Sequence, residues 1–102
     1  MLIQNASVTF PQVSGQGPQT QSVAVNMGSP VSSAVALLTG FTAEFSNGDD
    51  HNLGQLNVSL NVPAGSISGN VVTVEVALGL RDWSGNWDDK YDGSVSFVVV
   101  GQ

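Results

Sequence analysis

Cysteine is absent from this chain of 102 residues. Without cysteine there is no disulfide framework, and no site can use a thiolate as a metal ligand or as a nucleophile. The fold must therefore be held together by packing alone.

Positive charge is almost as scarce. Arg81 and Lys90 are the two cations against eight acidic residues, which gives a formal net charge of −6. So few cations cannot neutralise the phosphates of a nucleic acid or the anionic surface of a membrane. We therefore expect no nucleic-acid partner and regard cations, sugars and proteins as the better candidate ligands.

Long apolar runs are also missing. No stretch approaches the roughly 18 consecutive apolar residues that identify a membrane-spanning helix, so we expect no membrane insertion. Residues 1–8, MLIQNASV, have neither the basic region nor the apolar region of a classical signal peptide. The cellular location is therefore unknown from the sequence.

A helical period of 3.6 residues is absent, whereas alternation of apolar and polar residues is common. The clearest alternations run over 56–62 and 72–80 and predict two strands of one hairpin. Further strands are predicted over 6–10, 21–27, 35–45 and 94–100. The segment 35–45 is apolar nearly throughout and contains Gly40, so it is either buried on both faces or, as we favour, bent with a bulge at the glycine.

Turn residues separate these strands at short intervals, which is typical of antiparallel sheets. The prediction is an all-β fold, a six-stranded antiparallel β-sandwich, that forms a single domain over 1–102. In the last strand Val98 and Val100 occupy the face that should be polar, and an oligomer contact would explain this pattern. A chain this short gains stability by assembly, so we expect a homo-oligomer.

One stretch concentrates most of the chemistry. Residues 81–93 read RDWSGNWDDKYDG and hold both tryptophans, the single tyrosine, both cations and four of the six aspartates. Aromatic rings offer a flat face to the C–H side of a sugar, and carboxylates accept hydrogen bonds from its hydroxyls. The predicted carbohydrate-binding residues are Asp82, Trp83, Asn86, Trp87, Asp88, Asp89 and Tyr91. An alternative is that Trp83 and Trp87 cap the end of the sandwich while the aspartates form turns.

Calcium is a second hypothesis for the same stretch, because its oxygen-bearing side chains alternate through a loop that contains glycine. The candidate ligands are Asp82, Asp88, Asp89 and Asp92, alone or with Asp49 and Asp50. The pattern is not an EF-hand, since Trp87 stands where that motif needs glycine. No cofactor is required by this interpretation.

Catalysis is not predicted. His51 is the only histidine, and a zinc site needs three or four nitrogen or sulfur ligands, so a solvated loop histidine is the better interpretation. No serine lies in a G-x-S-x-G elbow. Carboxylates on one exposed loop lack the burial that raises the pKa of a general acid. We therefore expect a protein that is not an enzyme.

The stretch 35–99 resembles a known family. A Val-Ala-Leu-Leu strand, the pair Asn52-Leu53 and a loop from Trp87 to Tyr91 before a Ser-Val-Ser-Phe strand are similar to the H-type lectins, the family of snail agglutinin and the discoidin C-terminal domain. The resemblance implies a six-stranded sandwich that assembles into trimers or hexamers and binds galactose-type sugars between protomers. Trp87 and Tyr91 match the family's sugar-contacting aromatics, whereas Asp88 replaces its histidine and Gly54 its arginine.

Two functions follow from the sequence. The first is an oligomeric carbohydrate-binding lectin or adhesin that uses the loop, with or without calcium, and binds glycans and other copies of itself. Such a role would suit an extracellular or surface-exposed location. The alternative is a non-enzymatic structural or assembly domain of a fibre, coat or multiprotein particle, in which the loop packs against a neighbouring chain.

Overall fold

The computed structural model of the chain describes residues 1–13, 17–46 and 52–102. Its seven strands are β1 (Leu2–Val13), β2 (Gln19–Asn26), β3 (Ala34–Phe45), β4 (Leu53–Asn61), β5 (Ile67–Ser68), β6 (Val71–Asp82) and β7 (Tyr91–Gly101). The predicted all-β class is confirmed. Within the described ranges, no helix has the length and hydrophobicity needed to cross a bilayer.

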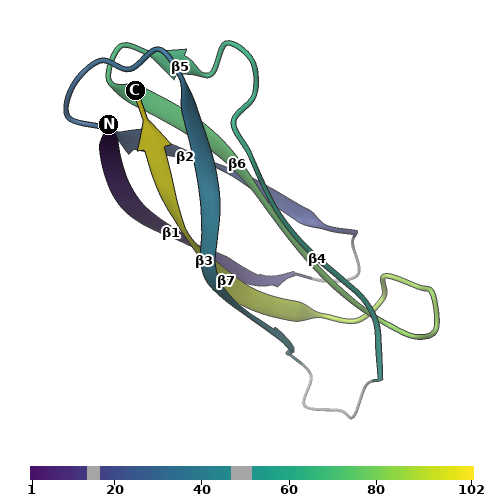
Figure 1. Cartoon of the computed structure of the whole chain (residues 1–102). Helices are drawn as coiled ribbons and strands as arrows, with labels where there is room; N and C mark the ends of the chain where they lie inside the picture. Colours follow the sequence, from purple (N-terminus) through teal and green to yellow (C-terminus); the bar gives the residue numbers. More distant parts are fainter. Residues whose placement is uncertain (14–16, 47–51) are drawn as a thin grey trace.

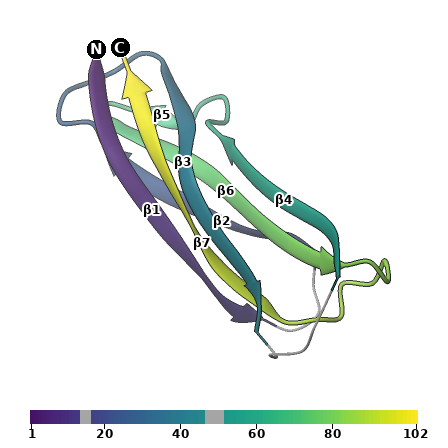
Figure 2. The same ribbon diagram turned by 60° about the horizontal axis from the view of Figure 1, so that its bottom comes forward.

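The strands form two antiparallel sheets that pack face to face, as Figures 1 and 2 show. One sheet has the order β1-β7-β3, and the other has the order β2-β6-β4 with β5 paired to β6. The predicted sandwich is therefore confirmed, but with seven strands rather than six. The additional strand, β5, forms inside the connection from β4 to β6. It is only two residues long, so an alternation of apolar and polar residues cannot be recognised in it.

The core lies between β6 and β7, which are the central strands of the two sheets. Alternation places one face of each strand inward, as predicted. The fully or nearly fully buried side chains of these strands are Val72, Val74, Val76, Leu78, Leu80, Tyr91, Val95, Phe97 and Val99. The predicted hairpin of the 56–62 and 72–80 segments is also confirmed, because β4 pairs antiparallel with β6 and Leu56 lies opposite Leu80.

β3 has the predicted bend. Its register against β7 shifts between Leu38 and Gly40, which is a β-bulge at the predicted glycine. Because β3 is an edge strand, its apolar side chains are not buried on both faces, and Val35 and Leu37 remain about half exposed.

β1 extends beyond its predicted end at Pro11. The register against β7 shifts between Phe10 and Val13, so the proline lies within an irregularity of the ladder. β1 is an edge strand, and proline is tolerated there because its missing N–H interrupts no second ladder.

The sandwich is elongated, with principal extents of 46 × 21 × 18 Å. Both chain termini lie at one end, and the β6–β7 connection lies at the other, together with the adjoining ends of β1, β3 and β4 (Figures 1 and 2). The stretch 81–93 is thus far from the chain termini.

Candidate functional site

The stretch 81–93 connects β6 to β7, which is the position that the sequence predicts. These two strands belong to different sheets, so the connection crosses the end of the sandwich. Residues 83–90 lie outside the strands, and we refer to them as the crossing loop. Figure 1 shows this loop projecting beyond the sheets.

The tip of the crossing loop is a short polar turn. The backbone N–H of Ser84 donates to Oδ1 of Asp82 at 3.0 Å, and the Ser84 hydroxyl donates to the same oxygen. The backbone N–H of Asn86 donates in turn to the Ser84 hydroxyl at 3.3 Å. Aspartate side chains that bond to the backbone two residues ahead stabilise turns of this kind. Asp82 therefore has a structural role in addition to any ligand role.

Trp87 anchors the crossing loop to the sandwich. Its ring lies 6.3 Å from the ring of Tyr91, with an angle of 56° between the planes, and the Arg81 guanidinium lies 5.9 Å from its centroid. Arg81 also donates from Nη1 to the carbonyl of Gly85 at 3.4 Å. The indole is partly buried by these contacts. This packing is the one expected from the alternative interpretation, in which Trp87 caps the end of the sandwich.

Tyr91 is completely buried, with 0% of its surface exposed. Its hydroxyl lies 3.0 Å from the carbonyl oxygen of Gly17 and 3.3 Å from that of Leu78. A side chain in this position has no surface to offer to a sugar, so the structure places Tyr91 in the core rather than in the binding surface. Its burial raises the pKa of the phenol, because the charged phenolate would lose hydration.

Replacing Tyr91 by phenylalanine should change how stability depends on pH. The phenol pKa is higher in the folded chain than in the unfolded one. The contribution of the neutral phenol to the free energy of unfolding is therefore fully present below a pH of about 10, and it is lost as the pH rises through the folded pKa. Tyr91→Phe should cost about 1 kcal/mol near neutral pH through the lost hydrogen bonds. It should also flatten the loss of stability in alkali. Urea unfolding followed by tryptophan fluorescence at neutral and alkaline pH measures both effects, and equal alkaline slopes would contradict the expectation.

Three of the four predicted calcium ligands come together. Asp82, Asp88 and Asp89 each place a carboxylate oxygen within 4.8 Å of the others. Asp92 lies apart, because it faces the outer side of β7, where Oδ2 accepts a hydrogen bond of 3.0 Å from the Ser46 hydroxyl. The four-aspartate set is therefore reduced to three by the alternation of side chains along β7.

Trp83 is the most exposed aromatic side chain in the described part of the chain, with 74% of its surface open. Its backbone is nevertheless fixed, since its N–H donates to the carbonyl of Asn52 at 3.0 Å. The neighbouring Leu53 is 62% exposed and lies opposite Asp82 in the ladder. Asn86 and Asp88 are also exposed. The surface around Trp83 thus combines an apolar ring with amide and carboxylate oxygens.

The close packing around Gly54 leaves no room for the arginine that the family resemblance implies at this position. A Cβ at Gly54 would lie 2.1 Å from the carbonyl oxygen of Asp82 and 2.8 Å from Cα of Trp83. The backbone of β4 therefore approaches the start of the crossing loop too closely for any side chain. The one nearby guanidinium, that of Arg81, lies over Trp87 instead.

The remaining predicted groups fall on segments without a description. Asp49, Asp50 and His51 lie outside the described residues. The calcium hypothesis therefore concerns Asp82, Asp88 and Asp89.

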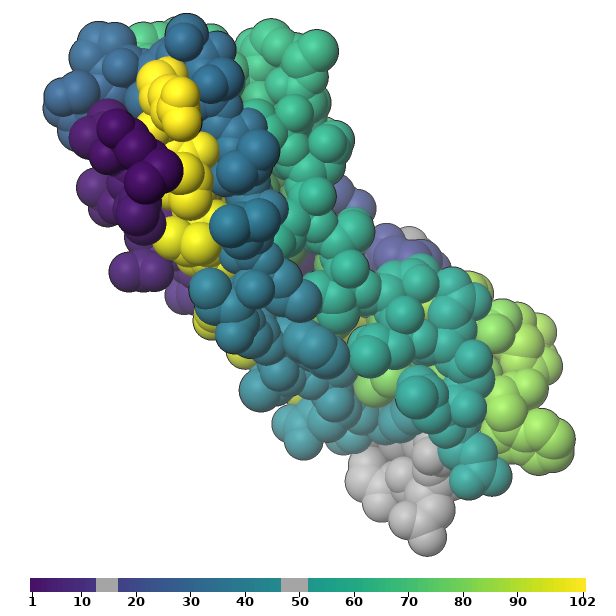
Figure 3. All heavy atoms as spheres, viewed as in Figure 1, coloured from purple at the N-terminus to yellow at the C-terminus, as the bar shows by residue number. Residues whose placement is uncertain are grey.

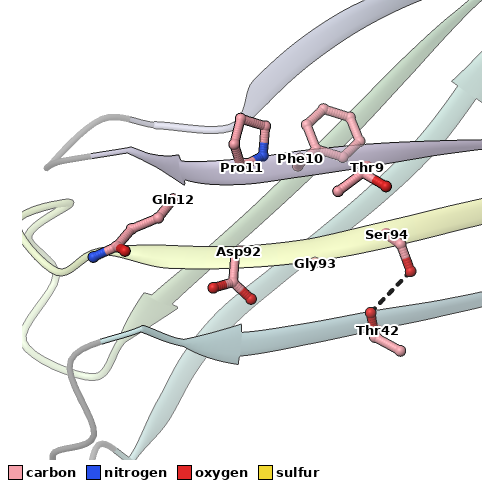
Figure 4. A pocket seen from close by; sticks show the side chains of 8 residues that line it. All are labelled: Thr9, Phe10, Pro11, Gln12, Thr42, Asp92, Gly93 and Ser94. Atoms are coloured by element: carbon pink, nitrogen blue, oxygen red, sulfur yellow. Dashed lines mark hydrogen bonds between the residues drawn. The ribbon is translucent and has the colours of Figure 1, made fainter.

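Sequence reasoning missed a hollow of about 370 Å³ on the outer face of the β1-β7-β3 sheet (Figure 4). Its lining includes the hydroxyls of Thr9, Ser94 and Thr42, which form one cross-strand row, and the Asp92 carboxylate. The Thr42 and Ser94 hydroxyl oxygens are hydrogen-bonded at 2.9 Å. Each residue is unremarkable in its own strand, and only the register between strands reveals the row.

A scan of protein-family models and searches of curated proteins and of solved structures find no match to this chain. The assignment to the H-type lectins therefore stays a prediction.

Proposed function

We propose that the crossing loop is a carbohydrate-binding site centred on Trp83. The observation that carries the proposal is the 74% exposure of an indole ring whose backbone is held in place by Asn52. An exposed ring of this size gains free energy when an apolar surface covers it. The C–H face of a pyranose ring is such a surface, and a sugar also carries hydroxyls for the neighbouring polar groups.

The polar groups beside Trp83 suit those hydroxyls. Asp88 and Asn86 are exposed on the same loop, and Asp82 precedes Trp83 in the chain. Carboxylates accept strong hydrogen bonds, and the amide of Asn86 both donates and accepts. In this site Trp87 orients the loop, while Tyr91 packs below it and does not touch the ligand.

We also propose calcium as an accessory to the same site. Asp82, Asp88 and Asp89 supply oxygen ligands, which Ca²⁺ prefers. Three carboxylates leave positions open in the coordination of about 6 to 8 oxygens that this ion takes, and water or sugar hydroxyls could fill them. Calcium would then bridge the loop and the sugar.

The H-type lectin assignment is part of this proposal and is supported by the sequence resemblance. Galactose-type sugars are therefore the first candidates. Because Gly54 and Asp88 stand where the family has its arginine and histidine, we expect a preference that differs from that of the family for N-acetylgalactosamine.

A glycan array with and without calcium, followed by titration of tryptophan fluorescence, tests the proposal. Trp83→Ala should weaken the binding of a selected glycan roughly tenfold to a hundredfold, because the ring contributes about 1.5 to 3 kcal/mol of apolar contact. Leu53→Ala is the matched control, since it removes a neighbouring exposed apolar side chain and should have a small effect. If no glycan binds, or if both variants bind like the wild type, the proposal fails.

The second candidate function is a non-enzymatic structural or assembly domain, in which the loop contacts another protein chain. The observation that favours it is the adjacency of Trp83 and Leu53, two exposed apolar side chains at one end of the molecule. Buried aromatic anchors dominate many protein interfaces. In that case Trp83→Ala should reduce assembly, whereas a lectin would keep its oligomeric state and lose the sugar.

A further inference from the structure

The surroundings of the candidate sugar site are negatively charged. Residues 81–93 carry four aspartates against two cations, Arg81 and Lys90, which is a net charge of −2 within a chain of net charge −6. Asp82, Asp88 and Asp89 each place a carboxylate oxygen within 4.8 Å of the others. Figure 3 shows the crossing loop, yellow-green by the colour bar, as a protrusion that a ligand can reach from solvent. A ligand that binds there lies in a negative potential.

Both cations of this stretch are placed at other parts of the loop than Trp83. The Arg81 guanidinium lies 5.9 Å from the ring centroid of Trp87, so the loop already holds one cation on an indole face. Lys90 adjoins β7, and its carbonyl accepts a hydrogen bond of 2.8 Å from the backbone of Ser46. Trp83 adjoins β6 in the other sheet, and 74% of its surface is exposed. Its ring can therefore receive a cation that a ligand supplies.

Asp82 is a carboxylate whose position is fixed before any ligand binds. The backbone N–H and the hydroxyl of Ser84 both donate to its Oδ1. Asp82 precedes Trp83, so their Cα atoms are about 3.8 Å apart. A carboxylate held in this way loses little conformational freedom on binding. Its attraction for a positive group also needs no direct contact, because charges act over a screening length of about 8 Å at physiological ionic strength.

We infer that the crossing loop selects sugars by charge and binds an amino sugar whose amine is free and protonated. The inference rests on the proposed carbohydrate site at Trp83 and names the ligand class of that site. The ammonium group is attracted by the carboxylates of Asp82, Asp88 and Asp89 and by the indole face, while the C–H face of the sugar covers the ring. Sugars that carry a carboxylate or a sulfate are repelled by the same aspartates. Among galactose-type sugars, the expected order of affinity is galactosamine, galactose and then galacturonic acid.

Tryptophan fluorescence titrations with the methyl glycosides of these three sugars test the inference. The buffer contains EDTA, which keeps calcium from the carboxylates, and has a pH of about 6, at which the amine is protonated and carboxylates are ionised. The galactosaminide should bind at least about fivefold more tightly than the galactoside, the change expected for one opposite unit charge about 4 Å away in water. The galacturonide should bind at least about fivefold more weakly. Salt at about 1 M, where the screening length is about 3 Å, should remove most of both differences.

Two isosteric substitutions locate the charge that selects the ligand. Asp88→Asn removes an exposed carboxylate of the cluster and should lower the ratio of galactosaminide to galactoside affinity roughly twofold to fivefold. Glu75→Gln, at an exposed residue of β6, changes the net charge by the same amount and is the matched control. It lies seven positions before Asp82, roughly 23 Å along the strand and beyond the screening length, so the ratio should stay at the wild-type value.

The outcomes separate this inference from the site on which it rests. If none of the three sugars binds and no glycan binds on the array, the proposed site and the charge selection both fail. A galactoside that binds as tightly as the galactosaminide, or more weakly than the galacturonide, overturns the charge selection and leaves the sugar site standing. An unchanged affinity ratio in Asp88→Asn also contradicts it. So does a galactosaminide that binds Trp83→Ala like the wild type, because the amine would then be attracted to another part of the acidic chain.

Discussion

Phe97→Ala is expected to remove about 3 to 5 kcal/mol from the free energy of unfolding. Phe97 lies on the central strand β7, and only 1% of its surface is exposed. Its loss would leave a cavity between the two sheets, because neighbours on both sides are fixed in ladders. Domains of this size are typically stable by about 5 to 15 kcal/mol, so the variant should be partly unfolded or close to unfolding at moderate temperature.

The measurement is chemical denaturation of the purified variant, followed by circular dichroism. Phe41→Ala is the matched control, since the same side chain is 43% exposed on the edge strand β3. Truncation there should cost no more than about half as much, because much of the ring is already in contact with water. Equal losses in the two variants would mean that the core is not centred on β7.

Gly93→Ala should disturb the pairing of β3 with β7. A Cβ at Gly93 would lie 2.0 Å from the carbonyl oxygen of Thr42 and 2.8 Å from Cδ2 of Leu78. The first of these atoms belongs to the backbone of a paired strand, so it cannot turn away as a side chain could. Overpacking of this kind typically costs about 1 to 3 kcal/mol, and a backbone clash is expected to lie at the upper end of that range.

Gly40→Ala makes the same chemical change on the partner strand and serves as the control. A Cβ at Gly40 would meet nothing within 4 Å, and its φ is not positive. The variant should be unchanged or more stable by roughly 0.4 to 1 kcal/mol, since alanine restricts the unfolded chain. Urea midpoints of the two variants, measured side by side, decide the matter. A stable Gly93→Ala protein would refute the close approach of the strands.

The alternation of apolar residues was sufficient to predict most strands and the sandwich. It fails where the pattern is short, as at β5, or where an edge strand tolerates an unusual residue, as at Pro11. Tyr91 shows a different failure. The inward series of Val95, Phe97 and Val99 continues backward through Gly93 to Tyr91, so the same period indicates its burial. Tyr91 is therefore the first inward residue of β7 rather than the last residue of the loop.

The aspartates of the candidate site illustrate what a single sequence leaves out. Asp88, Asp89 and Asp92 are close in the chain, yet the first two lie on the crossing loop and the third on the outer face of β7. This separation depends on the start of β7 at Tyr91. The position at which a strand starts depends in turn on its pairing with segments that are distant in the sequence. The hydroxyl row of Thr9, Ser94 and Thr42 likewise depends on pairings across the whole chain.

The pairing of Leu2 with Gly101 has a mechanical consequence. A force that pulls the two chain ends apart would act across neighbouring antiparallel strands, β1 and β7, at the same end of the ladder. The hydrogen bonds would then open one pair at a time, as in a zipper, rather than all together in shear. The domain should therefore yield at low tension from its terminal end, and the crossing loop at the far end would be the last part to feel the load.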